Sequence, residues 1–243
     1  MNYISRSEIG LVRKTNQDRV LVVQKDNVFL GVVCDGIGGA NGGDYASQKS
    51  IELFSESFKK SAGTFESIDT IIQWFKTTLN DINKTLYKES RKNMKLLGMG
   101  TTAAVIVVFN NRAIGFNVGD SRIYDYRRNR LSVLSHDQTY AYMMYLNNQI
   151  SIEDVAVHPK RNVLMNAVGV NETITFETIR IPDGWNRLLV CSDGLYGYVP
   201  HDHIESQMDQ PLEHAKKQLM DMAYKAGGFD NISYIILEGE TNV

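Results

Sequence analysis

The feature that most constrains the fold is the spacing of apolar residues, which changes along the chain. Short runs rich in β-branched and aromatic residues, each about the length of one strand, occur before residue 35 and again after residue 101. They lie at residues 21–23, 28–34, 102–109, 113–118, 122–126, 174–179, 188–191 and 232–237. Each run predicts a β-strand.

Between residues 35 and 102 the apolar residues recur every three or four positions, over 46–58 and again over 68–86. This spacing predicts two long helices directly after the second strand. A third helix is expected over 212–226, and a polar helical stretch over 139–155 interrupts the strands. Because the strands come in consecutive groups, we expect antiparallel sheets with helices packed outside them, an α+β fold.

The composition is that of a folded protein without a preference for nucleic acid or membranes. Of the 243 residues 43% are hydrophobic and only four are proline, which is enough for a sizeable core. The formal net charge of -2 supplies no basic field, so neither nucleic acid nor anionic lipid is expected as a partner. With no signal peptide, membrane span, repeat or linker, we expect one cytoplasmic domain over residues 1–243. Nothing indicates oligomerisation, so a monomer is expected.

The two cysteines, Cys34 and Cys191, each lie inside an apolar run. This setting is typical of reduced, buried thiols in a reducing compartment. A disulfide is the alternative, because each cysteine ends a predicted strand and the two strands can be neighbours.

Four aspartates stand where a predicted strand ends or begins: Asp35, Asp120, Asp193 and Asp230. Strands of a shared sheet bring their end residues to one rim, where converging carboxylates repel unless a cation holds them. The prospective ligands are all oxygen atoms, and no His/Cys cluster has metal-binding spacing, so Mg²⁺ or Mn²⁺ is expected rather than zinc. A lone Asp-Gly is an ordinary turn, but four aspartates at strand ends favour a metal centre.

The segment 10–18 precedes the first predicted strand and carries Arg13 and Asp18. A guanidinium matches two phosphate oxygens at once, so Arg13 is a better phosphate ligand than Lys14, although both are equally consistent with solvated loop charges. A glycine-rich loop over residues 38–43 then leads into a helix, where backbone amides attract anions. It lacks the Gly-Lys-Ser/Thr of a nucleotide P-loop.

In this order the motifs resemble those of the type 2C metal-dependent protein phosphatases, over nearly the whole chain. The matching segments are Arg13, Asn16 and Asp18; Asp35-Gly36; Gly100-Thr101-Thr102; Gly119-Asp120-Ser121-Arg122; residues 158–164; Ser192-Asp193-Gly194; and Asp230-Asn231. The resemblance implies a four-layer αββα sandwich. It also implies hydrolysis of phosphoserine and phosphothreonine on proteins, opposing eukaryotic-like Ser/Thr kinases, with Mn²⁺ or Mg²⁺ as cofactor.

The resemblance also assigns roles to the residues. Asp35, the Gly36 carbonyl, Asp193 and Asp230 hold two ions, with Asp35 bridging them. Asp18 acts through a water. A third, weaker ion uses Asp120 together with Asp193, and Arg13 binds the phosphoryl group. In such a site a hydroxide that bridges the two ions attacks phosphorus in line, without a phosphoenzyme.

The proton donor for the leaving group is not identified. Family members carry a histidine after the first Asp-Gly or after the Gly-Gly, where this chain has Ile37 and Ala40. His136 and His158 are distant candidates, and a water is the alternative. Aryl phosphates, which leave without help, should be affected least, so we predict hydrolysis of p-nitrophenyl phosphate with Mn²⁺.

Residues 134–168 match the variable flap beside the active-site cleft of this family. The segment is suited to substrate docking, but it is equally consistent with an ordinary surface loop region. Two other functions stay open. One is a catalytically silent module that binds phosphoproteins for regulation. The other is a two-metal phosphodiesterase or nuclease, which uses similar oxygen-rich sites; the acidic composition disfavours it.

Overall fold

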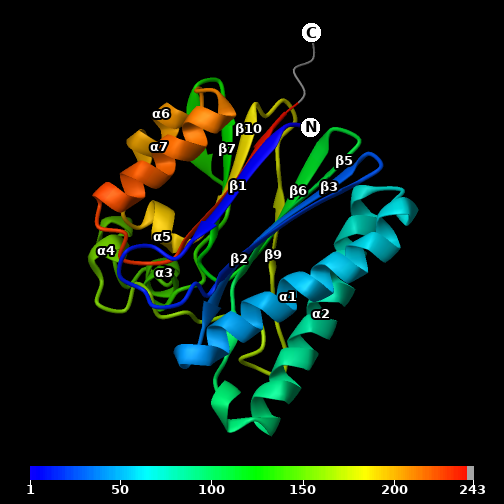
Figure 1. The fold of residues 1–243 in the computed structure, drawn as a ribbon, viewed down its shortest axis with the longest axis vertical. Helices are drawn as coiled ribbons and strands as arrows, with labels where there is room; N and C mark the ends of the chain where they lie inside the picture. Colours follow the sequence, from blue (N-terminus) through cyan, green and yellow to red (C-terminus); the bar gives the residue numbers. More distant parts are fainter. Residues whose placement is uncertain (240–243) are drawn as a thin grey trace.

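The chain folds into two antiparallel sheets packed face to face, with helices on the outer side of each sheet (Figure 1). The computed structural model describes residues 1–239, except the side chains at positions 40 and 41. The predicted α+β class and the four-layer αββα arrangement are confirmed.

The first sheet combines the beginning and the end of the described chain. Its order is β1-β11-β10-β7-β8, and every neighbouring pair is antiparallel. The strands are β1 (Tyr3–Glu8), β7 (Arg122–Arg127), β8 (Arg130–Val133), β10 (Arg187–Cys191) and β11 (Ile232–Glu238).

The second sheet has the order β2-β3-β5-β6-β9 and is also antiparallel. Its strands are β2 (Asp18–Lys25), β3 (Val28–Ile37), β5 (Ala103–Phe109), β6 (Arg112–Val118) and β9 (Glu177–Arg180), while the short β4 (Gly100–Thr101) pairs with the end of β3. The registers place Asp18 directly opposite Asp35.

The two long helices cover the outer face of the second sheet (Figure 1). They are α1 (Gly39–Ser61) and α2 (Ile68–Lys92), with the short 3₁₀ helices η1 (Ala62–Thr64) and η2 (Met94–Leu96) following each of them. A capping box between Ser67 and Thr70 satisfies the first amides of α2. Its apolar stripe then packs on the sheet, where the Phe75 ring stacks on Phe116 of β6 at a centroid distance of 4.0 Å.

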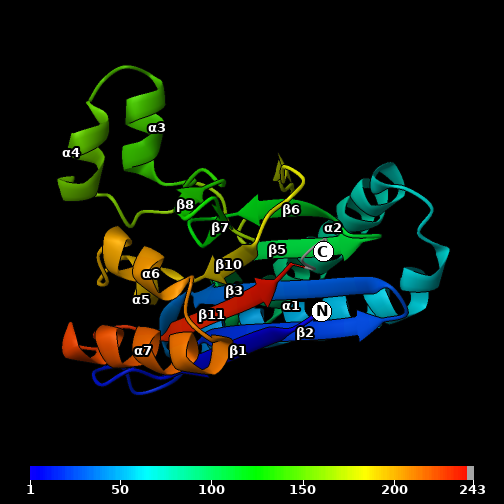
Figure 2. The same ribbon diagram turned by 90° about the horizontal axis from the view of Figure 1, so that it is seen from above.

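Three helices cover the first sheet: α5 (Asp193–Tyr196), α6 (His201–Gln207) and α7 (Leu212–Lys225). Leu219 of α7 and Tyr234 of β11 are fully buried in this layer. A third apolar layer, which includes Phe29, Ile123 and Ile235, fills the space between the sheets. Two further helices, α3 (Tyr140–Leu146) and α4 (Ile152–Val157), project away from the sandwich (Figure 2).

The structure corrects four expectations about the elements. The segment 10–18 does not precede the first strand, because β1 comes before it. Neither β1 nor β8 was predicted, since both are short edge strands in which polar and apolar residues follow no clear period. The predicted helix 139–155 is two helices, since Asn148 adopts a positive φ of 56° and Ser151 caps α4 separately. The strand expected from residue 174 begins at Glu177. The glycine-rich stretch 38–43 is mostly the first turn of α1 rather than a loop.

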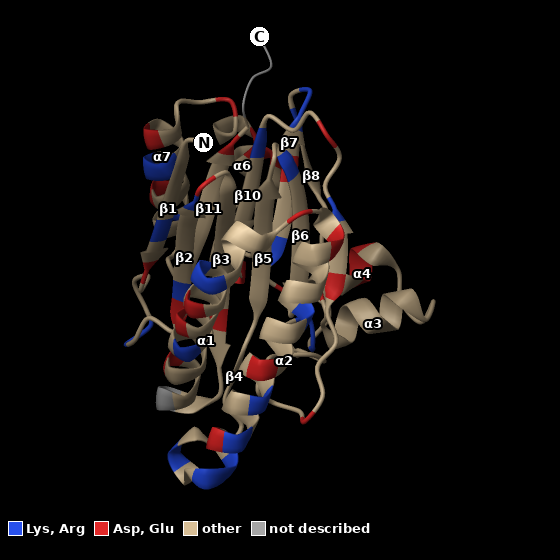
Figure 3. Cartoon of the chain, turned by 90° about the vertical axis from the view of Figure 1, so that its right-hand side faces the viewer, with Lys and Arg blue, Asp and Glu red and all other residues tan. Residues whose placement is uncertain are grey.

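Charged residues lie mainly on the helices, on loops and at the strand ends, while the strands are tan over most of their length (Figure 3). This distribution follows from the burial of both sheet faces in a four-layer sandwich. Within residues 1–239, no helix combines the length and the apolar character needed to cross a membrane.

Candidate metal centre

The predicted ligands come from both sheets and lie at the same end of the sandwich. Asp18 begins β2 and Asp35 lies opposite it near the end of β3. Asp193 begins α5 directly after β10, and Asp230 precedes β11. The Ser192 hydroxyl donates to Oδ2 of Asp18 at 2.7 Å, which joins the two sheets at this end.

The carboxylates repel one another in a site of limited solvent access, where Asp18 and Asp120 are buried and Asp35, Asp193 and Asp230 are partly buried. Burial, followed by the charges of Asp193 and Asp230, raises the pKa of Asp18 from 3.8 to about 7 despite two hydroxyl hydrogen bonds. Burial and the charge of Asp230 raise the pKa of Asp193 to about 6. The pKa values of Asp35 and Asp120 also lie well above 3.8, for the same two reasons in the same order. A cation among these groups would offset the cost of burying their charges and the repulsion between them.

The donor chemistry fits a hard divalent ion. All the carboxylates present oxygen, the ligand type that Mg²⁺ and Mn²⁺ prefer. Within residues 1–239, however, no three His, Cys, Asp or Glu side chains lie close enough together to enclose an ion by themselves. An ion at this site would therefore take backbone oxygen and water as further ligands, which suits Mg²⁺ because that ion usually keeps several waters.

The Gly36 backbone lies against the first turn of α1, in a space that only glycine fits. A Cβ on Gly36 would lie 2.1 Å from the carbonyl oxygen of Gly43, and one on Gly43 would lie 2.5 Å from the Gly36 carbonyl oxygen. Asp35 is held next to it by the Thr102 hydroxyl, which accepts from the Asp35 amide at 2.9 Å. The roles of Asp35 and Gly36 as ligands stay predictions.

Arg13 stands at the mouth of the cluster and pairs with Asp230. Its Nη2 donates to Oδ2 of Asp230 at 2.7 Å, and 53% of the Arg13 side chain is exposed. This hydrogen bond raises the pKa of Arg13, burial opposes the rise, and the charges of Asp230, Asp193 and Asp35 add to it. The guanidinium is thus partly exposed but directed toward the aspartates.

The loop that carries Arg13 is anchored by Asn231, a residue whose structural role the sequence did not reveal. The side-chain amide of Asn231 donates to the carbonyls of Ile9 and Thr15 at 2.9 and 3.0 Å, and its oxygen accepts from the Gln17 amide at 2.8 Å. These bonds connect segments more than 200 residues apart. The only sequence signal was that Asn231 follows Asp230 in the last motif.

A pocket of about 260 Å³ adjoins the cluster between α5 and the segment that carries α3 and α4. Asp120 and Asp193 both line it, together with Tyr196, Arg122 and Asp137. The expected proximity of Asp120 and Asp193 is therefore observed, while their sharing of an ion stays a prediction.

Arg122 organises one wall of this pocket. It binds Asp137 through two bonds of 2.9 and 2.7 Å, and its guanidinium lies 3.8 Å from the centre of the Tyr196 ring. Burial alone would lower the pKa of Arg122, but the hydrogen bonds and charge of Asp137 outweigh it, so the pKa is raised. The Tyr196 hydroxyl donates to the backbone oxygen of Asp120 at 2.8 Å, which holds that loop in place.

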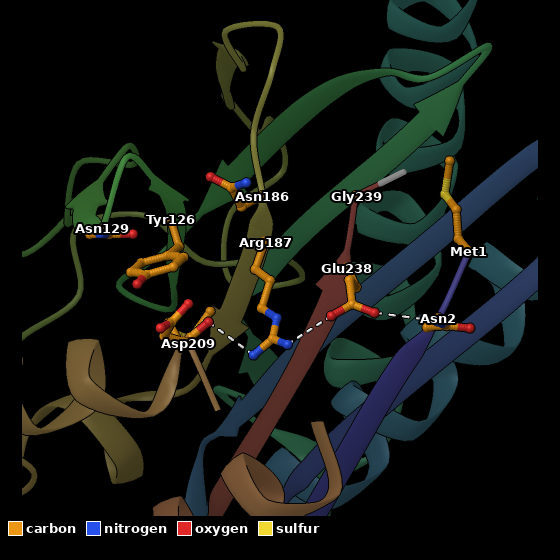
Figure 4. Close-up of a pocket in the computed structure, with 10 residues that line it drawn as sticks. Met1, Asn2, Tyr126, Asn129, Asn186, Arg187, Asp209, Glu238 and Gly239 are labelled. Atoms are coloured by element: carbon orange, nitrogen blue, oxygen red, sulfur yellow. Dashed lines mark hydrogen bonds and ion pairs between the residues drawn. The ribbon is translucent and has the colours of Figure 1, made fainter. Parts of the chain in front are cut away.

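A larger cavity, of about 660 Å³, lies at the opposite end of β10 and β11 and contains none of the aspartates in the cluster (Figure 4). Arg187 crosses it and donates to Glu238 at 2.7 Å and to the Met208 carbonyl at 2.9 Å. The guanidinium is thus engaged within the protein, and the cavity is separate from the candidate centre.

The candidate proton donors do not line the pocket beside the aspartates. His136 pairs with Glu177 at 2.5 Å, and His158 accepts from the Lys160 amide at 3.1 Å. Ile37 is partly buried at the end of β3, and the side chain of Ala40 lies outside the described residues.

Cys34 and Cys191 are free and buried, as predicted, and form no disulfide. Burial raises the pKa of the Cys34 thiol to about 12. A thiolate nucleophile at Cys34 is thereby disfavoured.

The sequence profile of the family described as "Protein phosphatase 2C" matches residues 12–225. The chain belongs to the protein phosphatase 2C family. The family and the phosphatase class expected from the motifs are confirmed, and metal dependence is general in this family.

Individual proteins of this family are similar to this chain over almost its whole length. The serine/threonine phosphatase stp of Listeria monocytogenes serotype 4b is 33% identical over 239 residues, which cover 96% of this chain and 94% of that protein. A bacterial serine phosphatase of known crystal structure has a TM-score of 0.92 at 28% identity, covering 100% of this chain and 99% of the other. Stp1 from Staphylococcus aureus has a TM-score of 0.90 at 28% identity, covering 98% and 94%.

Proposed function

We propose that this phosphatase hydrolyses phosphoserine and phosphothreonine on proteins, using two Mn²⁺ or Mg²⁺ ions and, more weakly, a third. The observation that carries the proposal is the convergence of buried and partly buried, mutually repelling carboxylates from both sheets, with Arg13 at the mouth 2.7 Å from Asp230. The relatives named above as serine and serine/threonine phosphatases support the choice of substrate.

The ions would be held by Asp35, Asp193, Asp230 and the Gly36 carbonyl, with Asp18 acting through water and Asp120 completing the third site. When bound, they would lower the pKa of an attacking water and neutralise charge on the phosphoryl group. Asp35 would be the central carboxylate of this set, because the charges of the other four aspartates all raise its pKa.

Arg13 would bind two phosphoryl oxygens and stabilise the charge that develops on them. Its present partner, Asp230, would then be free to turn toward the cluster, so substrate and cation would each favour the other's binding. Because burial raises the pKa of the Cys34 thiol to about 12 and no histidine among residues 1–239 lines the pocket beside Asp193, we propose direct attack by water without a phosphoenzyme. The proton for the leaving group would come from water.

The wider setting is proposed on the same basis. Residues 1–243 would form one monomeric, cytoplasmic catalytic domain, with residues 134–168 as a flap that contacts substrate. Its partners would be phosphorylated proteins, including Ser/Thr kinases whose action it reverses in signalling.

The test is hydrolysis of a phosphothreonine peptide by the purified full chain with Mn²⁺, compared with a bis-aryl phosphodiester. Asp193→Asn should reduce peptide turnover at least 100-fold, since changes merely adjacent to metal ligands cost about 10- to 100-fold. Asp183→Asn, at an exposed loop position, is the matched control and should retain activity. Preference for the diester, or no turnover of any phosphate ester by folded protein with Mn²⁺, would overturn the proposal.

The same variants separate an enzyme from a catalytically silent binding module. Calorimetry with Mn²⁺ should show binding to the unmodified chain and weaker binding to Asp193→Asn. If Mn²⁺ does not bind and a phosphopeptide binds both proteins equally, the silent module is the better account.

A further inference from the structure

Three exposed apolar side chains form a patch beside Arg13 and Asp230, which we name the mouth patch: Leu11, Tyr198 and Phe229. Their exposed fractions are 66%, 38% and 51%. Single exposed apolar residues are ordinary on protein surfaces, whereas a contiguous group next to a reactive centre is typical of a binding site.

Two adjacent glycines, Gly227 and Gly228, lie beneath the side chains of the patch. The Tyr198 and Phe229 rings lie 5.6 Å apart, and the Phe229 ring covers Gly227, where a Cβ would meet it at 2.1 Å. Leu11 lies over the next residue, Gly228, whose carbonyl accepts from the Leu11 amide at 2.7 Å. Both glycines have positive φ, 119° and 53°, so the tight turn that brings these side chains together depends on them.

The mouth patch borders the candidate centre on two sides. Leu11 lies two residues before Arg13, and Phe229 directly precedes Asp230, so both loops of the Arg13–Asp230 ion pair carry a patch residue. Tyr198 belongs also to the wall of the pocket that Asp193 lines. A group held by Arg13 therefore has apolar surface directly beside it.

The occupant follows from the form of the substrate. A phosphorylated residue of a protein arrives with its neighbours, which extend at most about 3.3–3.6 Å per residue along the chain. The residues next to it must therefore lie on the surface around Arg13. The patch side chains carry no charge with which to pair a charged neighbour, and they offer an apolar one a contact that excludes water.

We propose that the mouth patch binds an apolar side chain within three residues of the phosphorylated residue, so that the enzyme selects phosphosites with apolar neighbours. The inference rests on the proposed function and deepens it. Phe229 is its central residue, because its ring contacts Tyr198 and covers the turn that supports Leu11.

The experiment compares two phosphothreonine peptides of equal charge, one with leucine and one with serine at the three positions on each side of the phosphothreonine. The ratio of their kcat/KM values with Mn²⁺ is the readout, since apolar contacts in enzyme pockets give about 10-fold or greater discrimination. The unmodified chain should prefer the leucine peptide about tenfold. Phe229→Ser should reduce the ratio to about twofold, and Phe229→Leu should restore most of it.

Tyr3→Ser is the matched control, because Tyr3 is 43% exposed and stands at the far end of β1, opposite Leu237. It should keep the full ratio. A ratio near one for the unmodified chain, or an unchanged ratio in Phe229→Ser, would overturn the inference while peptide hydrolysis itself upholds the proposed function. A change of oligomeric state in Phe229→Ser with an unchanged ratio would show that a second copy of the chain covers the patch. If neither peptide is hydrolysed, the proposed function and the inference both fail.

Discussion

Replacing Asp18 by asparagine should stabilise the metal-free protein at alkaline pH. Asp18 is 1% exposed and its pKa is raised by burial and by neighbouring aspartates. Its ionised form is therefore unfavourable in the folded chain. Asparagine has nearly the same shape, carries no charge and can still accept the hydrogen bond that Ser192 donates at 2.7 Å.

The magnitude follows from linkage. The folded-state pKa of about 7 lies above the ordinary value of 3.8, a difference that corresponds to about 4 kcal/mol at about 1.4 kcal/mol per pH unit. Because the folded state binds the proton of Asp18 more tightly than the unfolded state, the contribution of Asp18 to stability is greatest below pH 4. This contribution is lost as the pH rises through 7. Rearrangement and water entry relieve part of this cost, so we expect Asp18→Asn to gain about 2 kcal/mol at pH 8 and almost nothing at pH 4.

The assay is urea unfolding of both proteins in EDTA between pH 4 and pH 8, with Asp183→Asn as the exposed control. Repeating it with Mn²⁺ should reverse the order, since an ion that binds only the folded cluster stabilises the unmodified chain more. If Asp18→Asn is less stable at pH 8 in EDTA, or if its effect does not change with pH, the carboxylates do not repel as argued.

Three further predictions concern the same centre. Arg13→Lys should lower kcat/KM for a phosphopeptide by about tenfold or more in steady-state kinetics, because lysine does not bind two phosphate oxygens at once; an unchanged value would remove Arg13 from the site. Gly36→Ala should lower the free energy of unfolding by about 1–3 kcal/mol, since the new Cβ would lie 2.1 Å from the Gly43 carbonyl oxygen. Gly63→Ala, where no atom lies within 4 Å, should leave it nearly unchanged in the same urea titration. EDTA should abolish hydrolysis of p-nitrophenyl phosphate and added Mn²⁺ should restore it; persistent activity in EDTA would contradict a metal centre.

The fold was predictable where the sequence has a strong period. The helices α1, α2 and α7 and most strands occur where apolar spacing placed them. The period was weak in β1, where Ile4 is the buried residue of the strand, and in the short β8. The stretch 139–155 was misjudged because local capping by Ser151 decides where one helix ends and another begins.

The aspartates of the candidate site were also predictable, because their positions at strand ends and their order along the chain are local signals. Their partners were not. Asn231 contacts Ile9, which lies 222 residues away in the sequence. Arg122 contacts Asp137 and the Tyr196 ring, and these three residues belong to separate segments of the chain. No spacing in the sequence relates these residues, since each contact depends on how the two sheets and their loops pack.

The sequence by itself therefore determined the α+β class and the family, and it predicted the aspartates of the candidate centre. These properties depend on residue type and on short-range periodicity, both of which are local. Only the tertiary structure decided that Asp18 is buried opposite Asp35, that Arg13 meets Asp230 and that Phe229 forms an apolar surface beside them. Burial, repulsion and contact depend on distances in space, which the chain sets only when its distant segments have packed together.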